Sequence, residues 1–261
     1  MKTKALLVVS FGTSRDENRE LSFGAVERSL AAEFPDYEVR RAFTSRIIRA
    51  KLAERGEARI DGVSEALGHL LAEGIREAVV QPTFVIDGRE YKKAAAEAAK
   101  LAGRFRRFAL AAPLIASDGD CAELAEIMAA GVPGDTAAVY VGHGSVHPAD
   151  SAYLRLRRVL AEQCRGNCFV GSFTGKAEPE GVIRQLRAAG FSKALLRPLL
   201  ICAGKHVLGD MAGNSESSWK QRFETAGFEV SCEAEGLGQR EAVRGLIARH
   251  AREAMATGRR A

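Results

Sequence analysis

Short apolar runs alternate along the chain with longer amphipathic stretches rich in alanine, leucine, glutamate and arginine. Apolar runs of this length predict buried strands, and the amphipathic stretches have the spacing of helices that bury one face. The predicted strands are residues 4–10, 37–43, 77–83, 107–112, 137–142, 167–173, 193–201 and 228–232. The predicted helices are residues 18–33, 60–74, 91–102, 119–130, 151–163, 179–189, 216–226 and 239–256. The alternation is typical of an α/β protein with mainly parallel sheets.

The predicted strands fall into two groups of four, and the segments that follow them match between the two halves. The matching segments are 9–13 with 141–145, 43–45 with 173–175, and 81–90 with 197–206. We therefore predict two Rossmann-like lobes related by a pseudo-twofold axis, residues 1–118 and 119–261, each with a four-stranded mainly parallel sheet. Ligands of such sheets bind at the carboxyl ends of strands, so side chains from both lobes should line one cleft. They are Phe11, Thr44, Glu90, His143, Thr174 and His206.

The composition is that of a globular protein, with 46% hydrophobic residues in 261. The first apolar run, residues 5–9, has the length of a strand and no small-residue cleavage site follows it. No run approaches the roughly 20 apolar residues of a membrane span. The five cysteines are widely spaced and odd in number, and Cys164 and Cys168 lack zinc-motif spacing. We expect a cytoplasmic protein with no membrane partner.

The net charge of +5 is modest, but arginine and lysine recur beside glycines at the predicted strand ends. This placement favours a polyanionic ligand. No aromatic-basic motif indicates nucleic acid, and the basic end, residues 258–260, is expected to be a solvated tail.

Two of the five histidines lie in predicted loops after buried strands. His143 stands between two glycines, and His206 lies in a long glycine-rich loop. Each is either an exposed functional imidazole or a turn histidine satisfied by backbone groups. His69 and His250 lie in helical patterns, where packed or surface histidines are ordinary, and His147 beside Pro148 fits a helix entry.

Neutral imidazoles bind cobalt, nickel, iron and zinc, and a ligand shell of two histidines leaves positions that a substrate can complete. Such a site is suited to passing a metal on. Inserting a metal into a porphyrin-like ring requires removal of two pyrrole protons, and a histidine, which titrates near neutral pH, can accept one of them.

Several segments carry a resemblance that spans nearly the whole chain. They are residues 6–14, 41–45, 87–91, 142–147, 203–213, 217–220 and 236–238. In these the chain resembles the sirohydrochlorin cobaltochelatases of the anaerobic cobalamin pathway, the CbiK family of class II chelatases. The resemblance implies two Rossmann-like lobes, a tetrapyrrole in the cleft between them, and no use of a nucleotide. It also implies that His143 and His206 hold the incoming Co²⁺ and that His143 accepts a proton.

One position departs from the family pattern. A glutamate usually follows the second strand of the C-terminal half as a third metal contact, and here Thr174 occupies that place. A neutral hydroxyl is a poorer ligand than a carboxylate, so we expect weaker metal affinity or an altered metal preference. The nearby carboxylates that could compensate are those of Glu90, Glu178 and Glu180, although all three also fit a helix start.

The substrate that the resemblance implies is a polycarboxylate, and it needs cations. The candidates are Arg46, Arg89, Lys176 and Lys205. Phe11 and Tyr91 are candidates for packing against the ring, and Ser10, Thr13 and Glu90 for further contacts.

Two alternatives stay open at this point: insertion of Fe²⁺ or Ni²⁺ instead of Co²⁺, and a tetrapyrrole or metal carrier without catalysis. The sequence also leaves open whether the chain forms a homo-oligomer. A nucleotide-binding protein is disfavoured because residues 10–14 match neither a dinucleotide fingerprint nor a P-loop.

Overall fold

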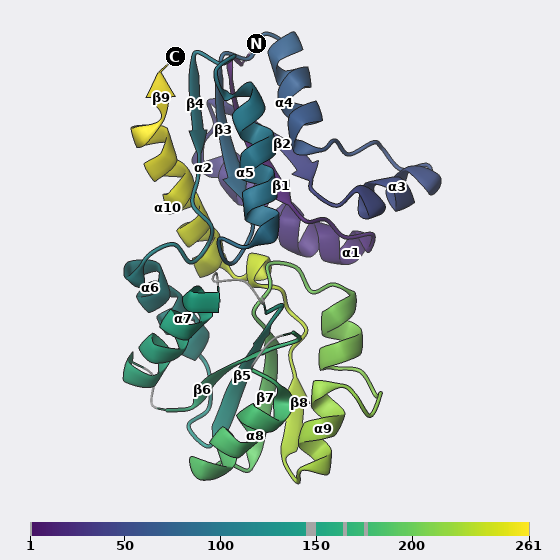
Figure 1. The fold of residues 1–261 in the computed structure, drawn as a ribbon, viewed down its shortest axis with the longest axis vertical. Helices are drawn as coiled ribbons and strands as arrows, with labels where there is room; N and C mark the ends of the chain where they lie inside the picture. Colours follow the sequence, from purple (N-terminus) through teal and green to yellow (C-terminus); the bar gives the residue numbers. More distant parts are fainter. Residues whose placement is uncertain (1, 145–149, 164–165, 175–176, 261) are drawn as a thin grey trace. The chain divides into compact units, whose positions relative to one another are not determined.

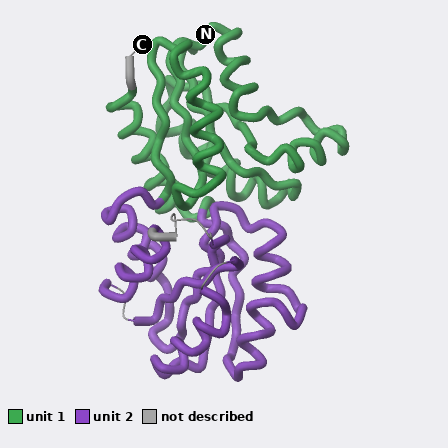
Figure 2. The backbone as a smooth tube through the Cα atoms, in the orientation of Figure 1, with its two compact units in different colours: residues 1–114, 238–261 green, residues 115–237 purple. Residues whose placement is uncertain are grey.

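The computed structural model describes residues 2–144, 150–163, 166–174 and 177–260. The chain forms two compact units (Figures 1 and 2). Unit 1 consists of Met1–Leu114 and Gly238–Ala261, and unit 2 consists of Ile115–Leu237. No helix within the described ranges is long and apolar enough to cross a membrane.

Unit 1 is built on a sheet of strand order β2-β1-β3-β4-β9, in which only β9 runs antiparallel. Its strands are β1 (Lys4–Ser10), β2 (Tyr37–Phe43), β3 (Glu77–Pro82), β4 (Arg107–Leu110) and β9 (Arg259–Arg260). Its helical segments are α1 (Asp16–Asn18), the π-helical η1 (Arg19–Gly24), α2 (Ala25–Glu33), α3 (Arg46–Glu54), α4 (Val63–Ala72), α5 (Arg89–Ala102) and α10 (Glu241–Thr257). Alternate side chains of β1 pack against α4 and α5, and those between them are also fully buried. Burial on both faces explains why the strand is continuously apolar.

Unit 2 has an all-parallel sheet of strand order β6-β5-β7-β8. Its strands are β5 (Thr136–Gly142), β6 (Cys168–Ser172), β7 (Lys193–Pro198) and β8 (Glu229–Cys232). Its helical segments are α6 (Asp118–Ala129), α7 (Asp150–Gln163), α8 (Pro179–Ala188), the π-helical η2 (Val207–Met211) and α9 (Trp219–Thr225), and the 3₁₀ turn η3 (Leu237–Gln239) contains the boundary between the units. Val139, Val141 and Leu196 pack against α8 and α9 in one core cluster.

The predicted fold class is confirmed, and each predicted strand and helix lies at an observed element. The predicted extent of the second lobe differs from the structure. Helix α10 packs against α2, β3 and β4, so residues 238–261 belong to unit 1 and not to the lobe expected over 119–261. The pattern of an amphipathic helix gives its apolar face but does not tell which sheet that face covers. The expected solvated tail is also wrong in part, because residues 259–260 form β9 on the edge of β4.

The loops that follow the first strand of each unit share one pattern of backbone hydrogen bonds. The matching bonds are Thr44 N to Ser10 O and Ser45 N to Phe11 O in unit 1, and Phe173 N to Gly142 O and Thr174 N to His143 O in unit 2. Ser45, and not Thr44, is therefore the counterpart of Thr174. The predicted match of residues 43–45 with 173–175 is wrong by one residue, because both halves contain a Phe-Thr pair at adjacent positions.

The match of residues 81–90 with 197–206 is confirmed by the sheet register. Pro82 pairs with Val9 in unit 1, and Pro198 pairs with Val141 in unit 2. In both units a glycine then accepts the first bond of a helix, in Lys92 N to Gly88 O and in Leu208 N to Gly204 O. Glu90 and His206 consequently occupy equivalent positions.

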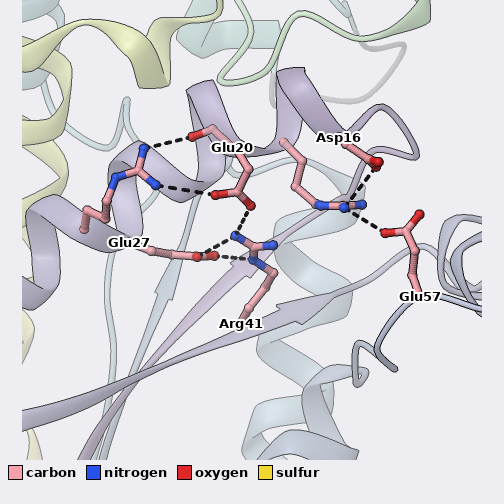
Figure 3. A network of polar contacts seen from close by, with 7 residues as sticks. Asp16, Glu20, Glu27, Arg41 and Glu57 are labelled. Atoms are coloured by element: carbon pink, nitrogen blue, oxygen red, sulfur yellow. Dashed lines mark hydrogen bonds and ion pairs between the residues drawn. The ribbon is translucent and has the colours of Figure 1, made fainter.

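An ion-pair network ties the outer helices of unit 1 to its sheet (Figure 3). Arg41 of β2 donates two hydrogen bonds of 2.7 Å to Glu27 of α2 and lies 3.4 Å from Glu20 of η1. Arg19 lies 3.0 Å from Asp16 and 2.7 Å from Glu57. Arg41 is therefore the main donor to the Glu27 carboxylate, while Glu20 is also paired with Arg28 at 3.4 Å.

We predict that Arg41→Ala lowers the free energy of unfolding by about 1–3 kcal/mol, because it leaves the half-buried carboxylate of Glu27 without its donor. The measurement is urea unfolding of the purified protein. Arg59→Ala is the control, because Arg59 is exposed and its acidic partners lie 3.4 and 3.6 Å away, and it should change the value by less than about 0.5 kcal/mol. Equal effects of the two changes would contradict the structural role of the network.

Candidate functional site

His143 and His206 lie together at the carboxyl ends of two neighbouring strands in unit 2. His143 follows β5 directly, and His206 lies in the segment after β7. The ring centroids are 5.5 Å apart with an interplanar angle of 47°. Both side chains are exposed. The sequence-predicted pair thus lies within one site.

The loop that carries His143 is held by a close backbone approach. Gly144 has a φ of +77°, and a Cβ atom there would lie 1.9 Å from the carbonyl oxygen of Thr174. Thr174 donates from its backbone nitrogen (3.1 Å) and its Oγ1 (2.8 Å) to the carbonyl oxygen of His143. Only glycine fits this position, which explains the residue after the histidine. The Thr174 hydroxyl is engaged with backbone, so it serves first to hold the loop.

The imidazole of His206 has contacts at its ring nitrogen and its ring face. The Nδ1 atom lies 2.5 Å from Oδ2 of Asp210. The Phe173 ring lies 5.7 Å from the imidazole, at an angle of 34°. Sequence analysis missed both partners, although the spacing of four residues between His206 and Asp210 is a signal that could have identified the pair.

The two imidazoles suit a divalent ion whose ligand shell the protein fills only in part. Among the residues that the structure describes, no group of three or more histidine, cysteine, aspartate or glutamate side chains is arranged to hold a metal ion. Two imidazoles can each give one nitrogen ligand to cobalt, iron, nickel or zinc and leave the other positions open.

The alternative carboxylates after β6 have structural positions. Glu178 is the N-cap residue of α8. Glu180 forms an ion pair with Arg222 of α9. Their predicted structural role is therefore favoured over metal binding. His147, Lys176 and Cys164 lie outside the described residues.

The equivalent corner of unit 1 holds a carboxylate in place of the imidazole. Glu90 accepts a hydrogen bond of 2.6 Å from Oγ1 of Thr44, and Nζ of Lys93 donates to the carbonyl oxygen of Thr44 at 2.7 Å. Thr44 and Phe173 are equivalent in the backbone pattern, so the Thr44–Glu90 pair corresponds to the Phe173–His206 pair. One backbone frame therefore presents an acid in unit 1 and a histidine in unit 2.

The other predicted substrate contacts of unit 1 differ in their exposure. Phe11 is the counterpart of His143 and is 46% exposed, as a ring-packing residue must be. Ser10 is fully buried and pairs with Thr83 at 2.8 Å, and Thr13 is buried and accepts from the nitrogen of Arg15. These hydroxyls are used inside unit 1, which counts against direct substrate contacts.

Tyr91 is half-buried at the start of α5. Its hydroxyl donates to the carbonyl oxygen of Ala111 at 3.2 Å. Burial raises the pKa of Tyr91, and the charge of Asp87 raises this pKa further. The hydroxyl therefore stays protonated and connects α5 to the end of β4.

Three predicted cations share an unusual location at the start of a helical segment. Arg46 is the first residue of α3, Arg89 is the first residue of α5, and Lys205 opens the turn that continues into η2. All three are exposed, and none of their side chains has an ion pair or hydrogen bond with a residue in the described ranges. A cation at a helix N-terminus opposes the helix dipole, so these positions are costly unless an anion binds there.

A protein-family model described as "Cobalt chelatase (CbiK)" matches residues 4–256 of this chain. The sirohydrochlorin cobaltochelatase of Salmonella typhimurium is 37% identical over 255 residues, which cover 97% of this chain and 96% of that protein. The sirohydrochlorin cobaltochelatase CbiKC of Nitratidesulfovibrio vulgaris is 32% identical over 234 residues, which cover 87% and 82%.

Solved structures agree in fold. SirB from Bacillus subtilis with Fe³⁺ superposes with a TM-score of 0.69 at 16% identity, over 98% of this chain and 97% of that one. The sirohydrochlorin chelatase SirB of Bacillus subtilis subspecies spizizenii in complex with cobalt gives a TM-score of 0.66 at 14% identity, with the same coverage. At these identities the likeness supports the two-unit α/β architecture alone.

We predict that Gly144→Ala lowers the free energy of unfolding by about 1–3 kcal/mol, because a side chain at this φ collides with backbone that cannot move aside. The measurement is urea unfolding. Gly134→Ala is the matched control, because Gly134 is an exposed loop glycine of unit 2 with nothing within 4 Å of an added Cβ. A Gly144→Ala protein as stable as the control would refute the close approach.

Proposed function

The chain belongs to the CbiK family of cobalt chelatases, and from this we propose that it inserts Co²⁺ into sirohydrochlorin without using a nucleotide. The observation that carries the proposal is the His143–His206 pair, two exposed imidazoles 5.5 Å apart at the strand ends. The proposed place of the reaction is the cytoplasm, in the anaerobic route to cobalamin. Fe²⁺ and Ni²⁺ are alternative metals, because imidazole ligands separate these ions poorly.

The reaction replaces two pyrrole protons by one Co²⁺ ion, so the products are the cobalt complex and two protons. His143 and His206 bind the ion through ring nitrogens and leave its other positions open for the pyrrole nitrogens of the substrate. When the ion passes to the ring, an imidazole becomes free to accept a proton, and we assign this role to His143. His206 is bonded through Nδ1 to Asp210, and we assign it the role of a metal ligand only.

Substrate binding in this proposal uses the three unpaired cations. Sirohydrochlorin is a polycarboxylate, and a carboxylate at each helix start would compensate both the cation and the helix dipole. Phe11 packs against the ring, and Glu90 and Tyr91 border the substrate. Ser10 and Thr13 shape the loop around Phe11 from within unit 1.

Thr174 lowers the affinity for the ion in this proposal. Its hydroxyl is neutral and already donates to His143, so it contributes little as a third ligand. Weak binding of the ion suits a protein that transfers it to a substrate. A carrier without catalysis and a homo-oligomer are outcomes that the experiments below distinguish.

We predict that His143→Ala lowers the rate of sirohydrochlorin metallation by about 10²–10⁴-fold, because it removes a metal ligand and the proton acceptor. The measurement is the rate of absorbance change under anaerobic conditions, with Co²⁺, Fe²⁺ and Ni²⁺ tested in parallel. The mass of the protein in solution is measured as well, to show whether it is a homo-oligomer. His69→Ala is the control, because His69 is an exposed helical histidine of unit 1, and it should keep full activity. If the unmodified protein binds the ring but never exceeds the spontaneous rate, it is a carrier and the proposal fails.

We predict that Arg89→Ala raises KM for sirohydrochlorin by roughly 2–10-fold with little change in kcat, because it removes a contact that forms equally in the bound ground state. The effect should shrink as salt is added. Arg59→Ala, an exposed arginine with acidic neighbours, serves as the charge-matched control. An unchanged KM in Arg89→Ala would remove this residue from the substrate site.

A further inference from the structure

We propose that Asp210 is a positioning residue that keeps the proton of His206 on Nδ1 and so presents the lone pair of Nε2 to the incoming ion. The part that concerns the ion rests on the function proposed above. The tautomer itself is a property of the metal-free protein.

The contact between the two side chains defines the donor and the acceptor. An ionised carboxylate only accepts hydrogen bonds, so at 2.5 Å the Nδ1 atom of His206 must carry the proton that it donates to Oδ2 of Asp210. In a neutral imidazole the other nitrogen then has the free lone pair. A carboxylate bonded to one nitrogen also makes the other nitrogen a stronger ligand.

The backbone beneath the pair holds Asp210 in reach of His206. Val207 and Met211, which lie next to them in the chain, are fully buried in the core of unit 2. The turn is also closely packed, because a Cβ at Gly213 would lie 2.2 Å from the carbonyl oxygen of Gly209. The segment is therefore anchored by apolar side chains, while His206 and Asp210 stay on its exposed side.

A second contact limits the rotation of the imidazole about its own bonds. The Phe173 ring lies against it at 5.7 Å, and the His143 ring lies at 5.5 Å. Asp210 fixes which nitrogen carries the proton, and Phe173 fixes the plane of the ring. Together they restrict the direction in which Nε2 points.

The His206–Asp210 pair is too exposed to contribute much to the stability of the fold. The side chains of His206 and Asp210 are 54% and 58% exposed, and exposed ion pairs contribute little to the free energy of unfolding. A comparable pair elsewhere in the chain gives the matched control. His69 Nδ1 lies 2.7 Å from Oδ2 of Asp61 with His69 at 59% exposure, in unit 1.

The first test is the tautomer in the metal-free protein. Two-bond ¹H–¹⁵N correlation spectra at about pH 8, above the usual histidine pKa, should show His206 with its proton on Nδ1. Asp210→Ala should shift His206 toward the Nε2-protonated form and leave His69 unchanged, and Asp61→Ala should do the reverse. An unaltered His206 tautomer in Asp210→Ala, or an Nε2 proton in the unmodified protein, overturns the proposal.

The second test is titration of the protein with cobalt chloride alone. Asp210→Ala should weaken Co²⁺ binding about 10–100-fold, and Asp210→Asn should lie between, because its amide oxygen still accepts but carries no charge. Asp61→Ala should bind Co²⁺ like the unmodified protein. Equal affinities of Asp210→Ala and the unmodified protein overturn the positioning role. If the tautomer shifts as expected but the unmodified protein never metallates sirohydrochlorin, the proposed function fails while Asp210 keeps its role.

Discussion

The site depends on the contact between Thr174 and the main chain of His143. The carbonyl oxygen of His143 accepts two hydrogen bonds from Thr174, one from its backbone nitrogen and one from its hydroxyl. This contact draws the loops after β5 and β6 together so closely that only a glycine fits at position 144. The main chain of His143 is thereby held at the carboxyl end of β5, and its imidazole is exposed there. The rest of the site, from His206 to Phe173, is arranged around that fixed point.

The same backbone frame occurs in both units with different side chains. Phe11 occupies the position equivalent to His143, and Glu90 the position equivalent to His206, while the backbone hydrogen bonds around them are the same. The duplicated frame separates the requirements of the fold, which act on the main chain, from those of the site, which act on the side chains. The main chain is constrained by the parallel sheet and its turns, and the side chains above it are free to change from an aromatic ring to an imidazole or from a carboxylate to an imidazole.

Much of this arrangement could be predicted from the sequence, because buried parallel strands are continuously apolar and the loops that follow them are polar. The two histidines were identifiable since His143 follows such a strand directly and His206 lies in the glycine-rich loop after another. What escaped prediction depends on contacts between distant segments. The alignment of Thr174 with Ser45 required the hydrogen-bond register, and the inward use of the Ser10 hydroxyl required its contact with Thr83. Asp210 was overlooked because a histidine and an aspartate four residues apart also occur on ordinary surfaces.

The return of α10 to unit 1 has a consequence for the order of folding during synthesis. Unit 2 is one uninterrupted stretch, Ile115–Leu237, whereas unit 1 is completed only by the residues after it. The sheet of unit 1 emerges first but lacks the helix that covers β3 and β4 until translation has passed residue 257. The nascent chain therefore carries an uncovered apolar sheet face while unit 2 is being made, and that interval is when it depends most on protection from aggregation.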